Sequence, residues 1–139
     1  MGPLKGREGM NSKVIAEYIL NNVKEDYKVY EFGIGFNYEV ALILNEFVDL
    51  CVVDINERAI YKAKSLGLKG IVDNLFRPRF SYEDANLIYT IRPPLELVYS
   101  IVKIAKDVNA KLIIRPLSNE YMEGFKIKNY KGEFFYLMP

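Results

Sequence analysis

The chain has 139 residues and a mass of 16.1 kDa, and its 19 Lys and Arg balance 18 Asp and Glu. Half of the residues are hydrophobic, and the chain contains one Cys, no His and no Trp. A chain of this length buries roughly two thirds of the surface that its unfolded form exposes, which is enough for one domain with a core. The missing His and the single thiol exclude Ser-His-Asp and Cys-His catalysis and the usual zinc ligands. We therefore expect no metal and no familiar hydrolase.

The net charge of +1 argues against a protein held to nucleic acid or to a membrane by its overall charge. No stretch approaches 18 consecutive apolar residues, and no pattern typical of an export signal begins the chain. We expect a soluble, cytoplasmic protein. Residues 1–10 are rich in Gly and charge without periodicity, so we expect a flexible segment there and one domain over 11–139.

Hydrophobic periodicity predicts helices that alternate with short apolar strands. The helices are expected over 12–24, 38–47, 56–66 and 95–108, and the strands over 29–32, 50–53, 70–72, 87–91 and 111–114. Residues 74–85 are expected to form a loop, and 125–130 with 133–137 a hairpin around Lys131-Gly132. This alternation is typical of a three-layer Rossmann-like α/β domain. Its sheet is expected to be mostly parallel, with the hairpin as an antiparallel edge.

The first glycine turn, Gly33-Ile34-Gly35, follows the first strand, and ligands of open α/β sheets bind at the carboxyl ends of strands. A dinucleotide fingerprint needs a glycine at the position that Tyr38 occupies, and no Gly-Lys-Ser/Thr follows the turn. The turn therefore argues against NAD, FAD and nucleotide binding of the Walker type.

Glu-x-Gly-x-Gly after a first strand, with an acid after the second, resembles motif I of the class I S-adenosylmethionine-dependent methyltransferases. The resemblance implies S-adenosylmethionine as cofactor and seven binding positions: Glu31, Gly33, Gly35, Asn37, Asp54, Ile55 and Asp73. In that family the glycines let the backbone approach the cofactor, and the acid at the position of Asp54 binds the ribose hydroxyls. Glu31 would suit a cationic ligand, and Asp73 would lie near the adenine amino group. Asn37 replaces the third glycine and tolerates left-handed dihedrals.

A structural interpretation of these residues also stays open. Gly-x-Gly after a strand also makes a tight turn, Asp54 would cap the next helix, and Asp73 would be an ordinary loop residue. The single cysteine, Cys51, is expected to be a buried and unreactive thiol.

Arg92 and Arg115 each follow an apolar strand and precede a proline. On neighbouring strands the two guanidiniums would emerge side by side at the ligand edge, where their planar forks suit a carboxylate or phosphate. Alternatively, each would pair with an acid such as Asp73 or Glu96, or cap a helix carbonyl. Many amino-methyltransferases carry Asp or Asn before Pro-Pro here, so arginine disfavours methylation of an exocyclic amine. We predict anion binding at Arg92 and Arg115.

Four segments together are similar to a small archaeal family of uncharacterised proteins with a truncated methyltransferase-like Rossmann fold: Glu-Phe-Gly-Ile-Gly, Val-Val-Asp-Ile, Leu-Ile-Tyr-Thr-Ile-Arg-Pro-Pro and Leu-Ile-Ile-Arg-Pro-Leu. The similarity runs from the first helix to the hairpin. It implies the fold and no particular reaction.

The hairpin interleaves Lys126, Lys128 and Lys131 with aromatic residues, a composition compatible with stacking on single-stranded RNA. An aromatic edge packed on the sheet, or a homodimer contact, is the favoured interpretation. The predicted function is binding of S-adenosylmethionine or a nucleoside, with methyl transfer to a small anionic or RNA substrate if the chain is catalytic. The competing hypothesis is a non-catalytic regulatory or scaffold module that works as a homo-oligomer or with a protein partner. No catalytic base is predicted.

Overall fold

The computed structural model describes residues 10–117 and 122–138, so residues 1–9 of the predicted flexible segment lie outside the described part. The elements are α1 (Ser12–Leu20), β1 (Lys28–Phe32), α2 (Glu39–Leu44), β2 (Asp49–Asp54), α3 (Glu57–Ser65), β3 (Lys69–Val72), β4 (Leu87–Ile91), α4 (Leu95–Val108), β5 (Lys111–Arg115), β6 (Lys126–Tyr130) and β7 (Glu133–Leu137). The strands form one seven-stranded sheet in the order β3-β2-β1-β4-β5-β7-β6. The predicted Rossmann-like fold class is confirmed.

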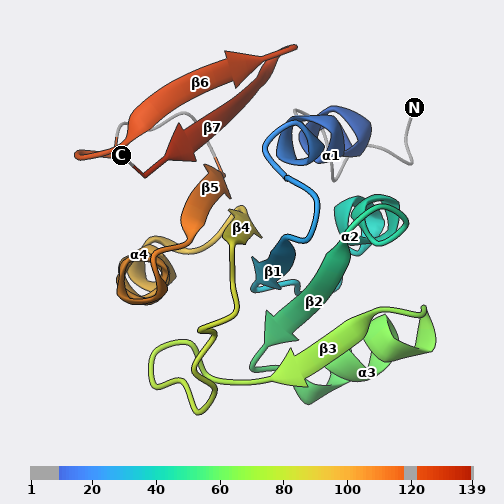
Figure 1. The fold of residues 1–139 in the computed structure, drawn as a ribbon. Helices are drawn as coiled ribbons and strands as arrows, with labels where there is room; N and C mark the ends of the chain where they lie inside the picture. Colours follow the sequence, from blue (N-terminus) through green and yellow to red (C-terminus); the bar gives the residue numbers. More distant parts are fainter. Residues whose placement is uncertain (1–9, 118–121, 139) are drawn as a thin grey trace.

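The hairpin extends the parallel sheet by two strands (Figure 1). Strands β1 to β5 are parallel, whereas β7 is antiparallel to both β5 and β6. The last strand therefore lies inside the sheet and β6 forms its edge. Lys131 and Gly132, with φ of +52° and +90°, make the tight turn that this pairing needs.

The two faces of the sheet are covered unequally. Helices α1, α2 and α3 pack on one face, and α4 packs on the other together with the connection between β3 and β4 (Figure 1). That connection contains no helix among the described residues, yet it buries Leu75, Tyr82 and Ala85 against the α4 face. A loop thus covers part of this face of the sheet, in the place where a helix would otherwise pack.

Two predicted helices are shorter in the structure than their hydrophobic patterns suggest. α1 ends at Leu20, and just beyond it the side-chain amide of Asn22 donates to the carbonyl oxygen of Tyr18. α2 ends at Leu44, just before Asn45. Asparagine favours helix ends because its amide competes with the backbone for hydrogen bonds. Helix starts follow the sequence more closely: Asn11 caps α1 and Asn56 caps α3 through their side-chain oxygens. Within the described ranges, no helix combines the length and apolarity needed to cross a bilayer.

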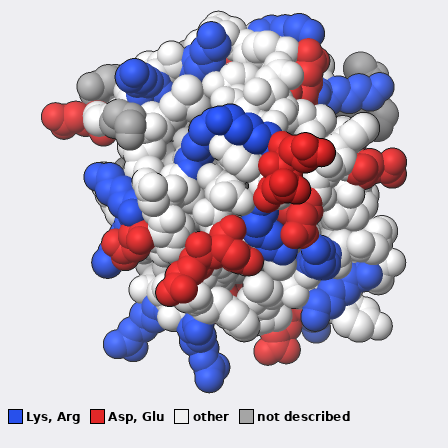
Figure 2. All heavy atoms as spheres, in the orientation of Figure 1, with Lys and Arg blue, Asp and Glu red and all other residues white. Residues whose placement is uncertain are grey.

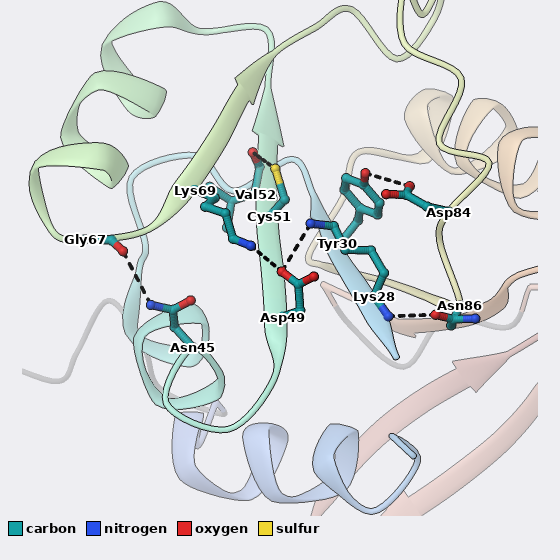
Figure 3. A network of polar contacts seen from close by, with 10 residues as sticks. All are labelled: Lys28, Tyr30, Asn45, Asp49, Cys51, Val52, Gly67, Lys69, Asp84 and Asn86. Carbon is teal, nitrogen blue, oxygen red and sulfur yellow. Dashed lines mark hydrogen bonds and ion pairs between the residues drawn. The ribbon is translucent and has the colours of Figure 1, made fainter. Parts of the chain in front are cut away.

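A polar network joins the starts of the strands at the amino edge of the sheet (Figure 3). Asp49 of β2 pairs with Lys28 of β1 at 3.2 Å and with Lys69 of β3. The backbone amide of Lys28 also donates to the side-chain oxygen of Asn86 at 2.7 Å. Asn86 is the residue just before β4, so this bond connects the network to a fourth strand. The network thus ties four strand starts together, at the edge opposite the glycine turn.

Candidate functional site

The glycine turn is fastened to the end of β2. Gly33 and Gly35 have φ of +76° and +58°, a region that residues with a Cβ rarely adopt. The amides of Gly33 and Ile34 both donate to the carbonyl oxygen of Val53, and the Gly35 amide donates to the Asp54 carboxylate at 2.8 Å. The turn is therefore held open by contacts with the neighbouring strand.

Tyr38, at the position where a dinucleotide fingerprint needs a glycine, reaches away from the turn to α3. Its hydroxyl donates to the carbonyl oxygen of Ala59 at 2.7 Å, and its side chain is buried in the core under α2 and α3. The large side chain thus links two helices.

Asp54 is held by backbone amides at the end of β2. One oxygen accepts from Gly35 and the other from Asn56, each at 2.8 Å. Asn56, not Asp54, caps α3, so the capping interpretation of Asp54 is wrong. A carboxylate has about four acceptor positions, so Asp54 keeps capacity for further donors.

Asp73 is buried and organises the connection between β3 and β4. Its oxygens accept from the amides of Asn74 and Arg79 at 2.9 and 3.0 Å, and from the Tyr82 hydroxyl at 2.7 Å. The side chain is only 3% exposed. It is therefore no ordinary loop residue, because these contacts position the loop beside the candidate site.

Glu31 is buried at the end of β1 against another buried polar group. The Tyr89 hydroxyl of β4 donates to its carboxylate at 2.6 Å. Burial raises the pKa of Glu31 to about 8, the Tyr89 hydrogen bond partly opposes that rise, and the negative charge of Asp54 adds to it. At neutral pH the carboxyl thus tends to keep its proton unless a cation replaces it.

Two adjoining pockets open at the carboxyl edge of the sheet. The Asp54 pocket, of about 230 Å³, is lined by Gly33, Asp54, Ile55, Asp73, Asn74, Leu75, Phe76, Pro94 and Leu97. The Glu31 pocket, of about 380 Å³, is lined by Glu31, Gly33, Ile34, Gly35, Phe36, Asn37, Val40, Ile91, Arg92 and Leu117. Gly33 belongs to both. All seven residues predicted to bind a cofactor line one pocket or the other.

Sequence reasoning missed several wall residues of these pockets. Asn74, Leu75, Phe76 and Leu97 line the Asp54 pocket without belonging to a recognisable motif. Only their place after strand ends, or at the start of a helix, could have indicated them.

The two arginines have different surroundings. Arg92 lines the Glu31 pocket, and among the described residues no carboxylate lies within ion-pair distance of it. Arg115 pairs with Glu133 at 2.8 Å, with exposed side-chain fractions of only 12% and 6%. The acid-pairing alternative therefore describes Arg115, with Glu133 as partner in place of Asp73 or Glu96. Arg115 lines neither the Asp54 pocket nor the Glu31 pocket, so anion binding at Arg115 stays a prediction.

The hairpin aromatics pack onto the domain. Phe135 stacks on Tyr18 of α1 with ring centroids 4.2 Å apart, and Lys131 and the Tyr130 hydroxyl both contact Glu17. These contacts agree with the favoured interpretation of a packed aromatic edge. Cys51 is buried, and burial raises the pKa of its thiol. Among residues 10–117 and 122–138, no group of His, Cys, Asp and Glu side chains is arranged to hold a metal.

Solved structures similar to this chain include methyltransferases that use S-adenosylmethionine. The chain superimposes with a TM-score of 0.66 and 12% identity on magnesium protoporphyrin IX methyltransferase from Synechocystis PCC 6803 with bound S-adenosylmethionine, covering 95% of this chain and 80% of that one. For an RNA methyltransferase from Salinibacter ruber in complex with S-adenosylhomocysteine, the TM-score is 0.65 at 12% identity, covering 93% and 92%. A third match, a protein from Pyrococcus horikoshii, has a TM-score of 0.59, and the chain described here spans 54% of it. The fold is thus that of the class I methyltransferases.

The model described as "Uncharacterised protein family (UPF0146)" matches residues 12–139. A UPF0146 protein of Methanocaldococcus jannaschii is 50% identical over 132 residues, which cover 92% of this chain and 96% of the relative. The chain belongs to the UPF0146 family, and the predicted similarity to an archaeal family of methyltransferase-like fold is confirmed.

Proposed function

We propose that this chain binds S-adenosylmethionine, or a closely related nucleoside, across the Asp54 and Glu31 pockets. The observation that carries the proposal is the convergence of all seven predicted positions on two pockets that share Gly33. Neighbours in the same fold contain S-adenosylmethionine or S-adenosylhomocysteine, which supports the same ligand class here. The cytoplasm, as expected from the sequence, is the proposed place of action.

The chemistry of the two pockets suits the two ends of such a ligand. Asp54 has acceptor capacity left for the ribose hydroxyls, and charge-assisted bonds of this kind contribute about 1.5–3 kcal/mol each. Glu31 would pair with the positively charged amino group of the methionine portion. The walls made by Ile55 and Leu75 would hold the apolar base.

S-adenosylmethionine supplies a methyl group on a positively charged sulfur. If transfer occurs, the chain contributes chiefly by holding donor and acceptor in line, an effect of proximity and orientation. Arg92 would hold an anionic acceptor beside the Glu31 pocket. We assign no residue as a base.

Calorimetric titration with S-adenosylmethionine and S-adenosylhomocysteine tests the proposal. We expect saturable binding by the wild type and a loss of at least about tenfold in Asp54→Asn, which removes the charge but keeps an acceptor oxygen. Asp107→Asn is the matched control, because Asp107 pairs with Lys103 on the exposed face of α4. Thermal unfolding checks that each variant folds. The absence of heat with both ligands in a folded wild type would refute the proposal.

The competing function is a non-catalytic nucleoside-binding module that works as a homo-oligomer or with a partner. The unequal cover of the sheet favours it, because the described residues of the β3–β4 connection form no helix to enclose an acceptor. Incubation with S-adenosylmethionine and a protein-free cell extract separates the two functions. Formation of S-adenosylhomocysteine above the Asp54→Asn background supports transfer, whereas binding without product supports the module.

A further inference from the structure

A third pocket lies beside the two already described, on the α4 face of the sheet. This Pro94 pocket, of about 250 Å³, is lined by Pro93, Pro94, Leu95, Val98, Ile114, Pro116, Leu117, Met122 and Tyr136. Its walls are the ends of β4 and β5 with the residues that follow them, the start of α4, Met122 before β6 and one residue of β7. Apart from Tyr136, every lining side chain is apolar.

The Pro94 pocket shares a wall with each of the other two. Pro94 also lines the Asp54 pocket, and Leu117 also lines the Glu31 pocket. A molecule in the Pro94 pocket would therefore lie next to a ligand that occupies the other two. Small-molecule sites begin at about 300 Å³, so the pocket suits a compact apolar body of one or two rings.

The rim of the Pro94 pocket leaves large apolar side chains in water. Leu95 is 57% exposed and Leu117 is 64% exposed, although both lie next to a cavity that would cover them once filled. Scattered exposed apolar residues are ordinary, but exposed residues that line one concave site mark a place for an apolar ligand.

The residue just before the first proline of the Pro94 pocket is a cation that lines the Glu31 pocket. Arg92 precedes Pro93 in the chain and lines the Glu31 pocket together with Leu117. Its φ is +56°, a left-handed conformation that is unfavourable for a residue with a Cβ, and its amide donates to the carbonyl oxygen of Arg115 at 2.6 Å. Such backbone strain concentrates at functional sites. Within the described part of the chain, no acid within ion-pair distance neutralises this guanidinium.

We propose that the Pro94 pocket and Arg92 together bind a small amphipathic anion, with an apolar ring body in the pocket and a carboxylate, sulfonate or phosphate on the guanidinium. The positive charge of Arg92 selects a negatively charged ligand: its planar fork matches an oxyanion, and its charge repels an ammonium group. The role of this ligand as methyl acceptor rests on the proposed function; its binding does not.

The experiment compares two probes of one shape, 2-naphthoate and its uncharged amide 2-naphthamide, by calorimetry with and without saturating S-adenosylhomocysteine. We expect the wild type to bind 2-naphthoate at least about tenfold more tightly than the amide, in line with a charge-assisted hydrogen bond. Arg92→Gln should make the two affinities equal, and Arg92→Lys should keep part of the preference. Arg77→Gln is the matched control, since Arg77 is an exposed arginine on the β3–β4 connection.

A second pair of variants tests the apolar half. The double change Leu95→Ala with Leu117→Ala trims the rim and should weaken both probes by the same factor. Tyr99→Ala is the control, because Tyr99 is 69% exposed on α4 and does not line the pocket.

Three results would overturn the inference: equal affinity of the wild type for both probes, no binding of either probe, or displacement of 2-naphthoate by S-adenosylhomocysteine. Displacement would mean that the apolar body of the probe, and not only its carboxylate, occupies the Asp54 or Glu31 pocket. Failure of the proposed function looks different, because 2-naphthoate would then bind in an Arg92-dependent way while S-adenosylhomocysteine would not bind.

Discussion

At the scale of single residues, Glu31 is a buried acid that also lines a candidate ligand pocket. The side chain is 2% exposed, yet it lines the Glu31 pocket and shares a hydrogen bond with the buried Tyr89 hydroxyl. Its pKa of about 8 lies above the ordinary value of 4.5, so the folded protein holds a proton that the unfolded chain has released. This group therefore stabilises the fold fully below about pH 4.5, and its contribution declines as the pH rises toward 8.

Binding of a cationic ligand at Glu31 should therefore depend on pH. Because the ligand needs the ionised carboxylate, we expect affinity for S-adenosylhomocysteine to rise from pH 6 toward 8, by up to about tenfold per unit, and then to level off. Calorimetry in buffers of different ionisation enthalpy would detect the released proton. 5′-Methylthioadenosine, which lacks the amino group, should show no such dependence.

Glu31→Gln is the control for the pH dependence. It preserves the shape but has no proton to release, so its affinity should be lower and flat between pH 6 and 8. The free energy of unfolding of the wild type, relative to Glu31→Gln, should fall across the same interval. A parallel rise in ligand affinity in wild type and variant would assign the pH dependence to another group.

The sequence predicted the pocket residues better than it predicted their local partners. Glu31, Asp54 and Asp73 are predicted because each falls at the end of a strand, and parallel strands bring their carboxyl ends to one edge. The binding of Asp73 by Tyr82 and by loop amides was not predictable, because an irregular loop has no period that shows which side chains turn inward.

At the scale of elements, a buried ion pair joins β5, β7 and the start of α1. Arg115 pairs with one oxygen of Glu133, and the other oxygen accepts from the backbone amide of Asn11 at 2.8 Å. Periodicity placed these elements along the chain, but the insertion of β7 between β5 and β6 was not predicted. A hairpin pattern specifies its own pairing and not which of its strands joins the sheet.

Removing one member of this ion pair should destabilise the domain without removing ligand binding. We expect Glu133→Gln to lower the free energy of unfolding by about 3 kcal/mol, because it removes the negative charge that pairs with a largely buried guanidinium. The double variant Arg115→Met with Glu133→Leu should recover much of that loss. Urea denaturation gives the values, and Lys103→Met on the exposed face of α4 is a control expected to change stability by less than about 1 kcal/mol. A tenfold loss of 2-naphthoate binding in the folded double variant would contradict this prediction and show that Arg115 contributes to ligand binding.

At the scale of the whole molecule, protection of the backbone should decrease from the middle of the sheet to its edges. β1 and β4 are almost fully buried, whereas β6 is exposed along most of its length and β3 is partly exposed. Positive and negative side chains are interspersed over the face shown in Figure 2.

Native-state hydrogen exchange should therefore rank the strands. We expect amides of β6 and β3 to open with free energies lower than those of β1 and β4 by about 2 kcal/mol or more. Measurement at two protein concentrations also tests the predicted homo-oligomer. Added protection of β6 at the higher concentration would indicate a second copy along that edge, and equal protection of β6 and β1 in the dilute protein would contradict the ranking.

The separation of the two edges of the sheet matters for protein engineering. Asp49, with Lys28 and Lys69, ties the strand starts together, while the candidate ligand residues lie at the strand ends and on the turns and loops that follow. Changes in those loops would leave the ion pairs of Asp49 with Lys28 and Lys69 intact. New binding loops could therefore be grafted onto the carboxyl edge with little effect on the stability of the sheet. The chain offers a minimal scaffold for building small-molecule receptors.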